Sequence, residues 1–274
     1  MSGKKAFGIA WHIMILSMLI VFFSPRLESV FLSLLLGEVM ILIPICLGIF
    51  LLKLGGDTDI KKLLGINPLK KEYILWIILL TITFKFYSPT IMSGVEALLV
   101  TLFEEPDYIL PKSNIGSVFV LCIVAPVIEE ILSRGVIFSL FKKTGNLSAL
   151  IFSSLGFSLM HLDIVSVIPI FFMGLLLGIL RLSTGSIIAP IIAHSLSNLF
   201  AFIMLKTEIY NSTAITLTAI GMVLFPIILW RFLERFNVGE KIAMKIKIPG
   251  VSFGMVLSIL LFLGFNIYKF LFNV

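Results

Sequence analysis

Long apolar runs, separated by short polar stretches, recur along the whole of this 274-residue chain. A run of about 18 residues without charge is long enough to cross the hydrocarbon core of a bilayer as a helix. A soluble domain of this size could not bury them all, since 59% of the residues are hydrophobic and only 13% are charged. We therefore expect a single integral membrane domain over residues 1–274.

The runs predict an all-α polytopic bundle of eight or nine transmembrane helices. Lipid cannot satisfy exposed backbone groups, and no alternating pattern of a membrane β-barrel is present. Ser88-Pro89 predicts a break after the third run, followed by an interfacial or re-entrant helix within residues 90–103. The apolar runs cover residues 7–23, 30–52, 73–86, 115–141, 147–162, 164–180, 187–205, 213–230 and 251–270.

Basic residues gather in alternate loops, and the intervening loops are poor in Lys and Arg. The positive-inside rule then predicts a cytoplasmic N-terminus. The same distribution argues against nucleic-acid binding despite the formal net charge of +6. Usage rich in Lys, Ile and Phe suggests an AT-rich genome and hence a bacterial plasma membrane. The basic positions are Lys4, Lys5, Lys53, Lys61, Lys62, Lys70, Lys71, Lys142, Lys143, Arg181, Arg231, Arg235, Lys241, Lys245 and Lys247.

Three charged residues interrupt the fourth run, in the stretch Ala125-Pro-Val-Ile-Glu-Glu-Ile-Leu-Ser-Arg134. Charges at this depth are costly and usually mark a functional site. Glu130 and Arg134 are spaced to pair on one helical face, whereas Glu129 lies about 100° away and is expected to point elsewhere. Pro126 is expected to kink the helix ahead of it. A structural ion-pair network is the alternative interpretation, but two carboxylates and one arginine leave one carboxylate without a counter-charge.

Two later runs carry the other polar candidates. His161 follows Phe157 by four residues, and His194 shares a helical face with Asn198. A lone histidine such as His161 is more typical of a structural role than of catalysis, and structural hydrogen bonding is the alternative for His194 and Asn198. Counted along the helices from their basic ends, all reach intermediate depth, so a water-filled cavity open to the cytoplasm could unite them with Glu129.

Other features of the apolar runs are interpreted as structural. Glu38 and Lys85 are expected to meet as a neutralising pair, although a path lined by both would favour a transporter. Gly174 and Gly178 are expected to allow close packing of a neighbouring helix.

The three motifs, in this order on successive membrane helices, resemble those of the CAAX prenyl protease and bacteriocin-processing family (CPBP or Abi) of intramembrane endopeptidases. The resemblance covers a catalytic core of about residues 115–205, in the middle of the chain. The motifs are Glu129-Glu130-xxx-Arg134, Phe157-xxx-His161 and His194-xxx-Asn198.

The resemblance implies a role for each motif residue. Glu129 would be the general base that activates a water, and His161 would help to hold that water. His194 and Asn198 would stabilise the oxyanion, with Glu130 and Arg134 as the supporting pair. This division suits peptide hydrolysis, which needs a deprotonated water and preorganised donors for the developing negative charge. No Ser or Cys with an adjacent base is apparent, so direct attack by water is favoured.

No cofactor is expected, but zinc stays open as an alternative. Glu129, His161 and His194 could form a His2Glu zinc set with one open position. The His-Glu-x-x-His motif of many zinc proteases is absent, and a liganding Glu129 would leave only Glu130 as a base. A metal-independent glutamate mechanism is therefore favoured.

The leading hypothesis is an intramembrane endopeptidase acting on a membrane-associated protein or an exported peptide. A non-catalytic membrane protein conferring bacteriocin self-immunity is the alternative. A small-solute transporter is less favoured, because no internal repeat and no pair of broken midplane helices is visible. The sequence specifies neither the substrate nor whether it is prenylated.

Overall fold

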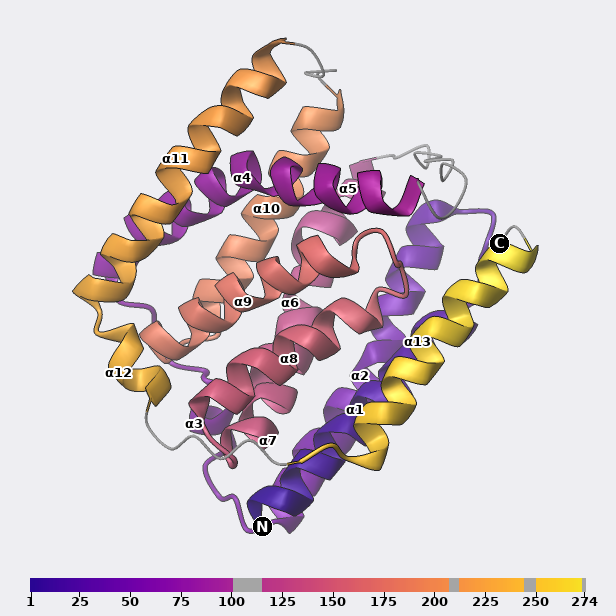
Figure 1. Ribbon diagram of the computed structural model, residues 1–274. Coiled ribbons are helices and arrows are strands. Elements are labelled where there is room, and N and C mark those ends of the chain that lie inside the picture. Colours follow the sequence, from indigo (N-terminus) through magenta and orange to yellow (C-terminus); the bar gives the residue numbers. More distant parts are fainter. Residues whose placement is uncertain (101–114, 207–211, 244–249, 273–274) are drawn as a thin grey trace.

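The computed structural model describes residues 1–100, 115–206, 212–243 and 250–272, and these residues form helices and connecting turns without a β-strand (Figure 1). Residues 115–142 form one continuous helix, here called the central helix, made of α5, η2, α6, η3 and α7. The elements are α1 (Gly3–Phe23), α2 (Val30–Leu54), α3 (Ile60–Leu64), η1 (Lys71–Tyr73), α4 (Ile74–Val100), α5 (Ile115–Phe119), η2 (Val120–Val124), α6 (Ala125–Glu130), η3 (Ile131–Ile137), α7 (Phe138–Lys142), α8 (Asn146–Met160), α9 (Val167–Thr184), α10 (Ile188–Lys206), α11 (Ser212–Arg235), α12 (Val238–Ala243) and α13 (Phe253–Phe272).

The predicted all-α polytopic bundle is confirmed. Within the described residues, seven helices are long and apolar enough to cross a membrane. Two further apolar helices, Asn146–Met160 and Ile188–Met204, are shorter than these spans. Each of the nine predicted runs therefore coincides with a helix, and the number that cross the bilayer stays a prediction.

The predicted break at Ser88-Pro89 is wrong, because α4 continues through both residues. Proline removes the N–H that would bond to the carbonyl four residues earlier, which here belongs to Lys85. The Ser88 hydroxyl donates to that Lys85 carbonyl at 3.1 Å and replaces the missing donor. Residues 90–100 extend α4, and residues 101–103 and the acidic loop around Glu104 lie outside the described residues.

The basic loops meet at one end of the bundle, where Figure 1 places the N-terminus, α3 and α12. The N-terminal ammonium group donates to the Gly55 carbonyl at 2.8 Å. Lys143 pairs with Asp57 at 2.7 Å, and Lys241 donates to the Ser183 carbonyl at 3.0 Å. Loops that the charge pattern assigns to one side therefore do lie together, while the assignment of that side to the cytoplasm stays a prediction.

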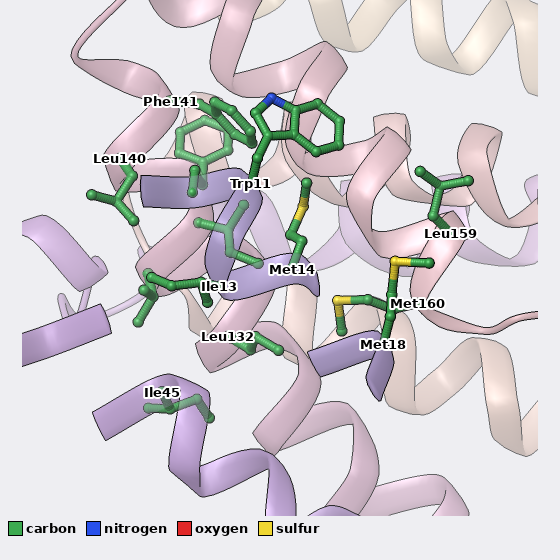
Figure 2. Close-up of a cluster of buried hydrophobic side chains, with 14 of the residues drawn as sticks. Trp11, Ile13, Met14, Met18, Ile45, Leu132, Leu140, Phe141, Leu159 and Met160 are labelled. Atoms are coloured by element: carbon green, nitrogen blue, oxygen red, sulfur yellow. The ribbon is translucent and has the colours of Figure 1, made fainter. Parts of the chain in front are cut away.

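An apolar core forms where α1 packs against the central helix and α8, with Trp11, Met14 and Phe141 lying close together (Figure 2). The Trp11 ring lies 5.7 Å from that of Phe141 and 6.1 Å from that of Phe152, between centroids. Phe7 contacts both phenylalanines edge to face at 5.1 Å. We call these five residues the Trp11 cluster.

The predicted role of Gly174 and Gly178 in packing is confirmed, since both lie where α9 crosses α8. A Cβ on Gly178 would come within 2.7 Å of the Leu150 side chain, and one on Gly174 within 3.0 Å of Ser154. The missing side chains therefore allow α8 and α9 to pack closely. Gly174 also brings its backbone to Arg134, which belongs to the candidate site.

Candidate active site

Two π-helical stretches, η2 and η3, flank the glutamate pair on the central helix. In η2 the Ala125 N–H donates to the Val120 carbonyl, five residues back instead of four. Pro126 follows at once, so the helix departs from α geometry directly ahead of Glu129, where a distortion is predicted. Stretches of π-helix within an α-helix are frequent at functional sites, because they redirect the side chains that follow.

Glu130 and Arg134 form the predicted ion pair, with 3.4 Å between Arg134 Nε and Glu130 Oε2 and both side chains fully buried. The guanidinium also donates to Ser133 Oγ at 2.6 Å and to the Gly174 carbonyl at 3.0 Å. Its carbon lies 4.3 Å from the centroid of the Phe157 ring. Arg134 thus joins the central helix, α8 and α9, and its buried charge is partnered on several sides.

His194 reaches both glutamates from α10. Its Nδ1 lies 3.0 Å from Glu130 Oε1, and its Nε2 lies 3.8 Å from Glu129 Oε2. The expectation that Glu129 points away from Glu130 and its partners is wrong. The two side chains leave the helix about 100° apart, but the two nitrogens of the His194 ring each face one of them. Three charged or polar groups from two helices therefore converge on one place.

The contacts of Glu130 determine how His194 is oriented. Glu130 is paired with Arg134 and acts as an acceptor, so the Nδ1–H of His194 donates to it and Nε2 faces Glu129. The Glu129 side chain is 21% exposed, in contrast to the fully buried Glu130. A separation of 3.8 Å is too long for a hydrogen bond, so Glu129 Oε2 and His194 Nε2 face each other without a direct bond.

Asn198 lies one turn beyond His194 on the same face of α10, as predicted. Its Nδ2 donates to the Leu121 carbonyl in η2 at 2.9 Å. The side chain therefore contacts the same helix as His194, about two turns before Glu130. One of the two amide hydrogens is engaged in this contact, and the other is free for a further acceptor.

His161 stands at the C-terminal end of α8, and its Nδ1 donates to the Phe157 carbonyl at 2.8 Å. The buried Phe157 ring contacts both histidines edge to face, 4.8 Å from His161 and 5.6 Å from His194 between ring centroids. In the described part of the chain, His161 is linked to the carboxylates through this ring and not by a direct ion pair. Phe157 is a site residue for which the sequence pattern indicates no role of its own, although it lies four residues before His161 in the motif.

Glu38 is a second acid that the structure adds to the surroundings of Glu129. It shares the buried face of α2 with Ile41 and Ile45, where α2 packs against the central helix. Its charge is close enough to that of Glu129 for the two to repel. Among the described residues, Glu38 Oε2 is buried without a hydrogen-bond partner, as is Glu129 Oε2.

The expected neutralising pair of Glu38 and Lys85 is wrong for the described residues, in which no ion pair joins them. The reason is the packing of their helices. Glu38 faces the central helix from α2, while α4, which carries Lys85, packs chiefly against α9, α10 and α11.

The described residues contain no group of three or more His, Cys, Asp or Glu side chains placed to hold a metal ion. The alternative zinc set of Glu129, His161 and His194 is thus not among such groups in the described residues.

An apolar groove of about 370 Å³ runs beside the site, between the first half of the central helix and α10. It adjoins Asn198 and lies on the side of the glutamates away from the basic loops. An extended apolar segment could lie in such a groove. The groove is lined by Ile115, Val118, Phe119, Cys122, Ile123, Ser195, Leu196 and Leu199.

Comparison with known proteins points to the same segment of the chain. Residues 111–200 match the model of a family described as "Type II CAAX prenyl endopeptidase Rce1-like". A Bacillus subtilis (strain 168) protein named "Putative membrane peptidase YdiL" is 35% identical over 95 residues, which are 34% of this chain and 39% of that relative. The match thus spans about two fifths of the relative's length. No solved structure matches the chain.

Proposed function

We propose that this chain, which through residues 111–200 belongs to the CAAX prenyl protease and bacteriocin-processing family, is an intramembrane endopeptidase. It would hydrolyse a peptide bond in a membrane-associated protein or an exported peptide. The observation that carries the proposal is the placement of His194 between a fully buried, ion-paired Glu130 and a partly exposed Glu129. One carboxylate orients the histidine, and the other is accessible for chemistry.

In the proposed mechanism, Glu129 takes a proton from a water that attacks the scissile carbonyl. It returns this proton to the amine nitrogen when the tetrahedral intermediate collapses and the C–N bond breaks. His194 Nε2–H and the second N–H of Asn198 then stabilise the oxyanion, while Glu130 holds His194 through Nδ1–H. With His194 protonated, two carboxylates, one guanidinium and one imidazolium leave the site without net charge. Donation from Nε2 as well as Nδ1 requires the imidazolium form of His194, which is part of the proposed mechanism.

The remaining motif residue has a supporting place in this scheme. His161 has its Nδ1–H engaged by the Phe157 carbonyl, so its Nε2 is the atom available to hold the attacking water. No metal is required for any of these steps. Activity that survives strong chelation in a metal-free preparation is the expected result, and loss of activity restored by zinc would overturn this part of the proposal.

Substrates would approach within the membrane. The apolar groove beside Asn198 suits a lipid-embedded segment, which is consistent with a membrane-associated protein or peptide as the partner. The test compares processed C-termini and secreted peptides of cells carrying the wild type or Glu129→Gln. Peptides that disappear in the variant support a protease. An unchanged peptide set, with bacteriocin protection retained by the variant, would favour the non-catalytic immunity protein.

The proposed orientation has a cytoplasmic N-terminus, with the site open towards the cytoplasm. It rests on the clustering of the basic loops at one end of the bundle. A cysteine introduced at Lys62, in α3, is expected to resist impermeant thiol reagents in intact cells and to react after lysis. Labelling of this cysteine in intact cells would show that the N-terminus lies outside the cytoplasm.

A further inference from the structure

The Leu121 carbonyl has lost its partner within the central helix. In η2 the Ala125 N–H donates five residues back, to Val120. One residue further on, the same register would join the N–H of residue 126 to the Leu121 carbonyl. Residue 126 is proline, which has no N–H. The chain therefore places a free acceptor on this helix, facing α10.

Asn198 supplies the missing donor from α10, because its Nδ2 lies 2.9 Å from the Leu121 oxygen. Because the Asn198 backbone is fixed in α10, this contact restricts the side-chain torsions of Asn198, and the second N–H then points in a defined direction. Donors that are oriented before the reaction stabilise developing charge better than donors that must reorganise.

We infer that Pro126 is a positioning residue, which acts on the reaction through Asn198. By withholding a backbone donor, Pro126 keeps the Leu121 carbonyl free to anchor the Asn198 amide, so that the second N–H is aimed at the oxyanion. The inference rests on the proposed function, in which Asn198 is an oxyanion donor. The anchoring itself is a property of the folded protein and can be tested without a substrate.

A double-mutant cycle in thermal stability tests the anchoring. Pro126→Ala supplies an N–H that can bond to Leu121 in the existing π register. Asn198→Ala should then lower the melting midpoint by roughly 2–4 °C in the wild-type background, as expected for one hydrogen bond, and by less than about 1 °C in the Pro126→Ala background. Equal losses in both backgrounds would overturn the anchoring.

A matched proline serves as the control. Pro226 lies exposed inside α11, so Pro226→Ala also adds a helix N–H but touches nothing in the site. Asn198→Ala is expected to lower the midpoint equally with and without Pro226→Ala. If Pro126→Ala does not fold, Pro126→Ser adds the same N–H and replaces it in the cycle.

Turnover tests the consequence for the reaction. Pro126→Ala should lower kcat about tenfold with KM unchanged, and should cause no further loss in the Asn198→Ala background. Full activity of Pro126→Ala, or additive losses in the double variant, would overturn the positioning role. If Glu129→Gln retains full peptidase activity, the proposed function fails instead, and the stability cycle still decides whether Pro126 and Asn198 are coupled.

Discussion

The central helix contributes side chains to two buried regions, one charged and one apolar. Near its middle, Glu130 and Arg134 are buried among hydrogen-bond partners from α9 and α10, and the Phe157 ring of α8 lies against the guanidinium. Near its end, Phe141 packs into the Trp11 cluster, whose side chains contact one another through apolar packing. In a membrane, lipid tails can replace apolar side-chain contacts that are lost. No lipid group in the hydrocarbon region can replace the partner of a buried charge. The charged region should therefore tolerate much less change than the apolar one.

The largest effect is expected for Arg134→Ala, which leaves Glu130 buried without its counter-charge. Breaking such a pair by removing one partner costs about 3–5 kcal/mol, so folded protein should fall sharply. The measurement is the stability of the purified protein in detergent. The control is Arg231→Ala, which breaks the exposed Arg231–Glu234 pair and should cost about 0–1 kcal/mol. If both substitutions lowered stability equally, burial would not determine how much each ion pair contributes to stability.

A smaller effect is expected for Phe141→Ala in the Trp11 cluster. A large-to-small change in a soluble core costs about 3–5 kcal/mol, and lipid or neighbouring side chains should reduce this to about 2–3 kcal/mol. The same detergent unfolding experiment measures it. Phe50→Ala removes an exposed ring from α2 and should change stability little. If Phe141→Ala costs more than Arg134→Ala, the comparison of the two buried regions is wrong.

The smallest change, and one of opposite sign, is expected for Glu38→Gln. This substitution removes the repulsion between Glu38 and Glu129 while keeping the shape of the side chain. Stability should rise by on the order of 1 kcal/mol, since a buried acid without a partner is replaced by a neutral group. Glu28→Gln, in the exposed turn before α2, is the control and should have no measurable effect. A loss of stability in Glu38→Gln would indicate a partner for this acid.

Much of the fold could be predicted from the positions of apolar runs and charges. The spacing of Glu130 and Arg134 predicted their pairing, and the alternation of basic loops predicted which loops meet. The break at Pro89 was wrong because a neighbouring hydroxyl, Ser88, replaces the lost donor. The expectation that proline breaks a helix considers only the backbone, and so it misses a side-chain hydroxyl that donates to the freed carbonyl.

The sequence indicates candidate residues for the site, but it does not indicate their arrangement. Helical spacing separates Glu129 from Glu130 correctly, yet it cannot show that His194 arrives from another helix and contacts both. Glu38 and Lys85 are both charges within apolar runs, and their positions in the sequence do not show that Glu38 faces the central helix and not α4. Which helix faces which is set by tertiary packing, and a single sequence does not specify it.

The most direct test of the central claim measures turnover and melting for Glu129→Gln and Glu130→Gln side by side in the purified protein. We expect Glu129→Gln to keep or slightly raise the wild-type melting midpoint, since it also removes the repulsion with Glu38, and to lose activity by a factor of about 10²–10⁴, as for the loss of a general base. Glu130→Gln should lose stability as well, because it weakens the contacts with both Arg134 and His194. An active Glu129→Gln protein, or an unstable Glu129→Gln beside a stable Glu130→Gln, would contradict the account.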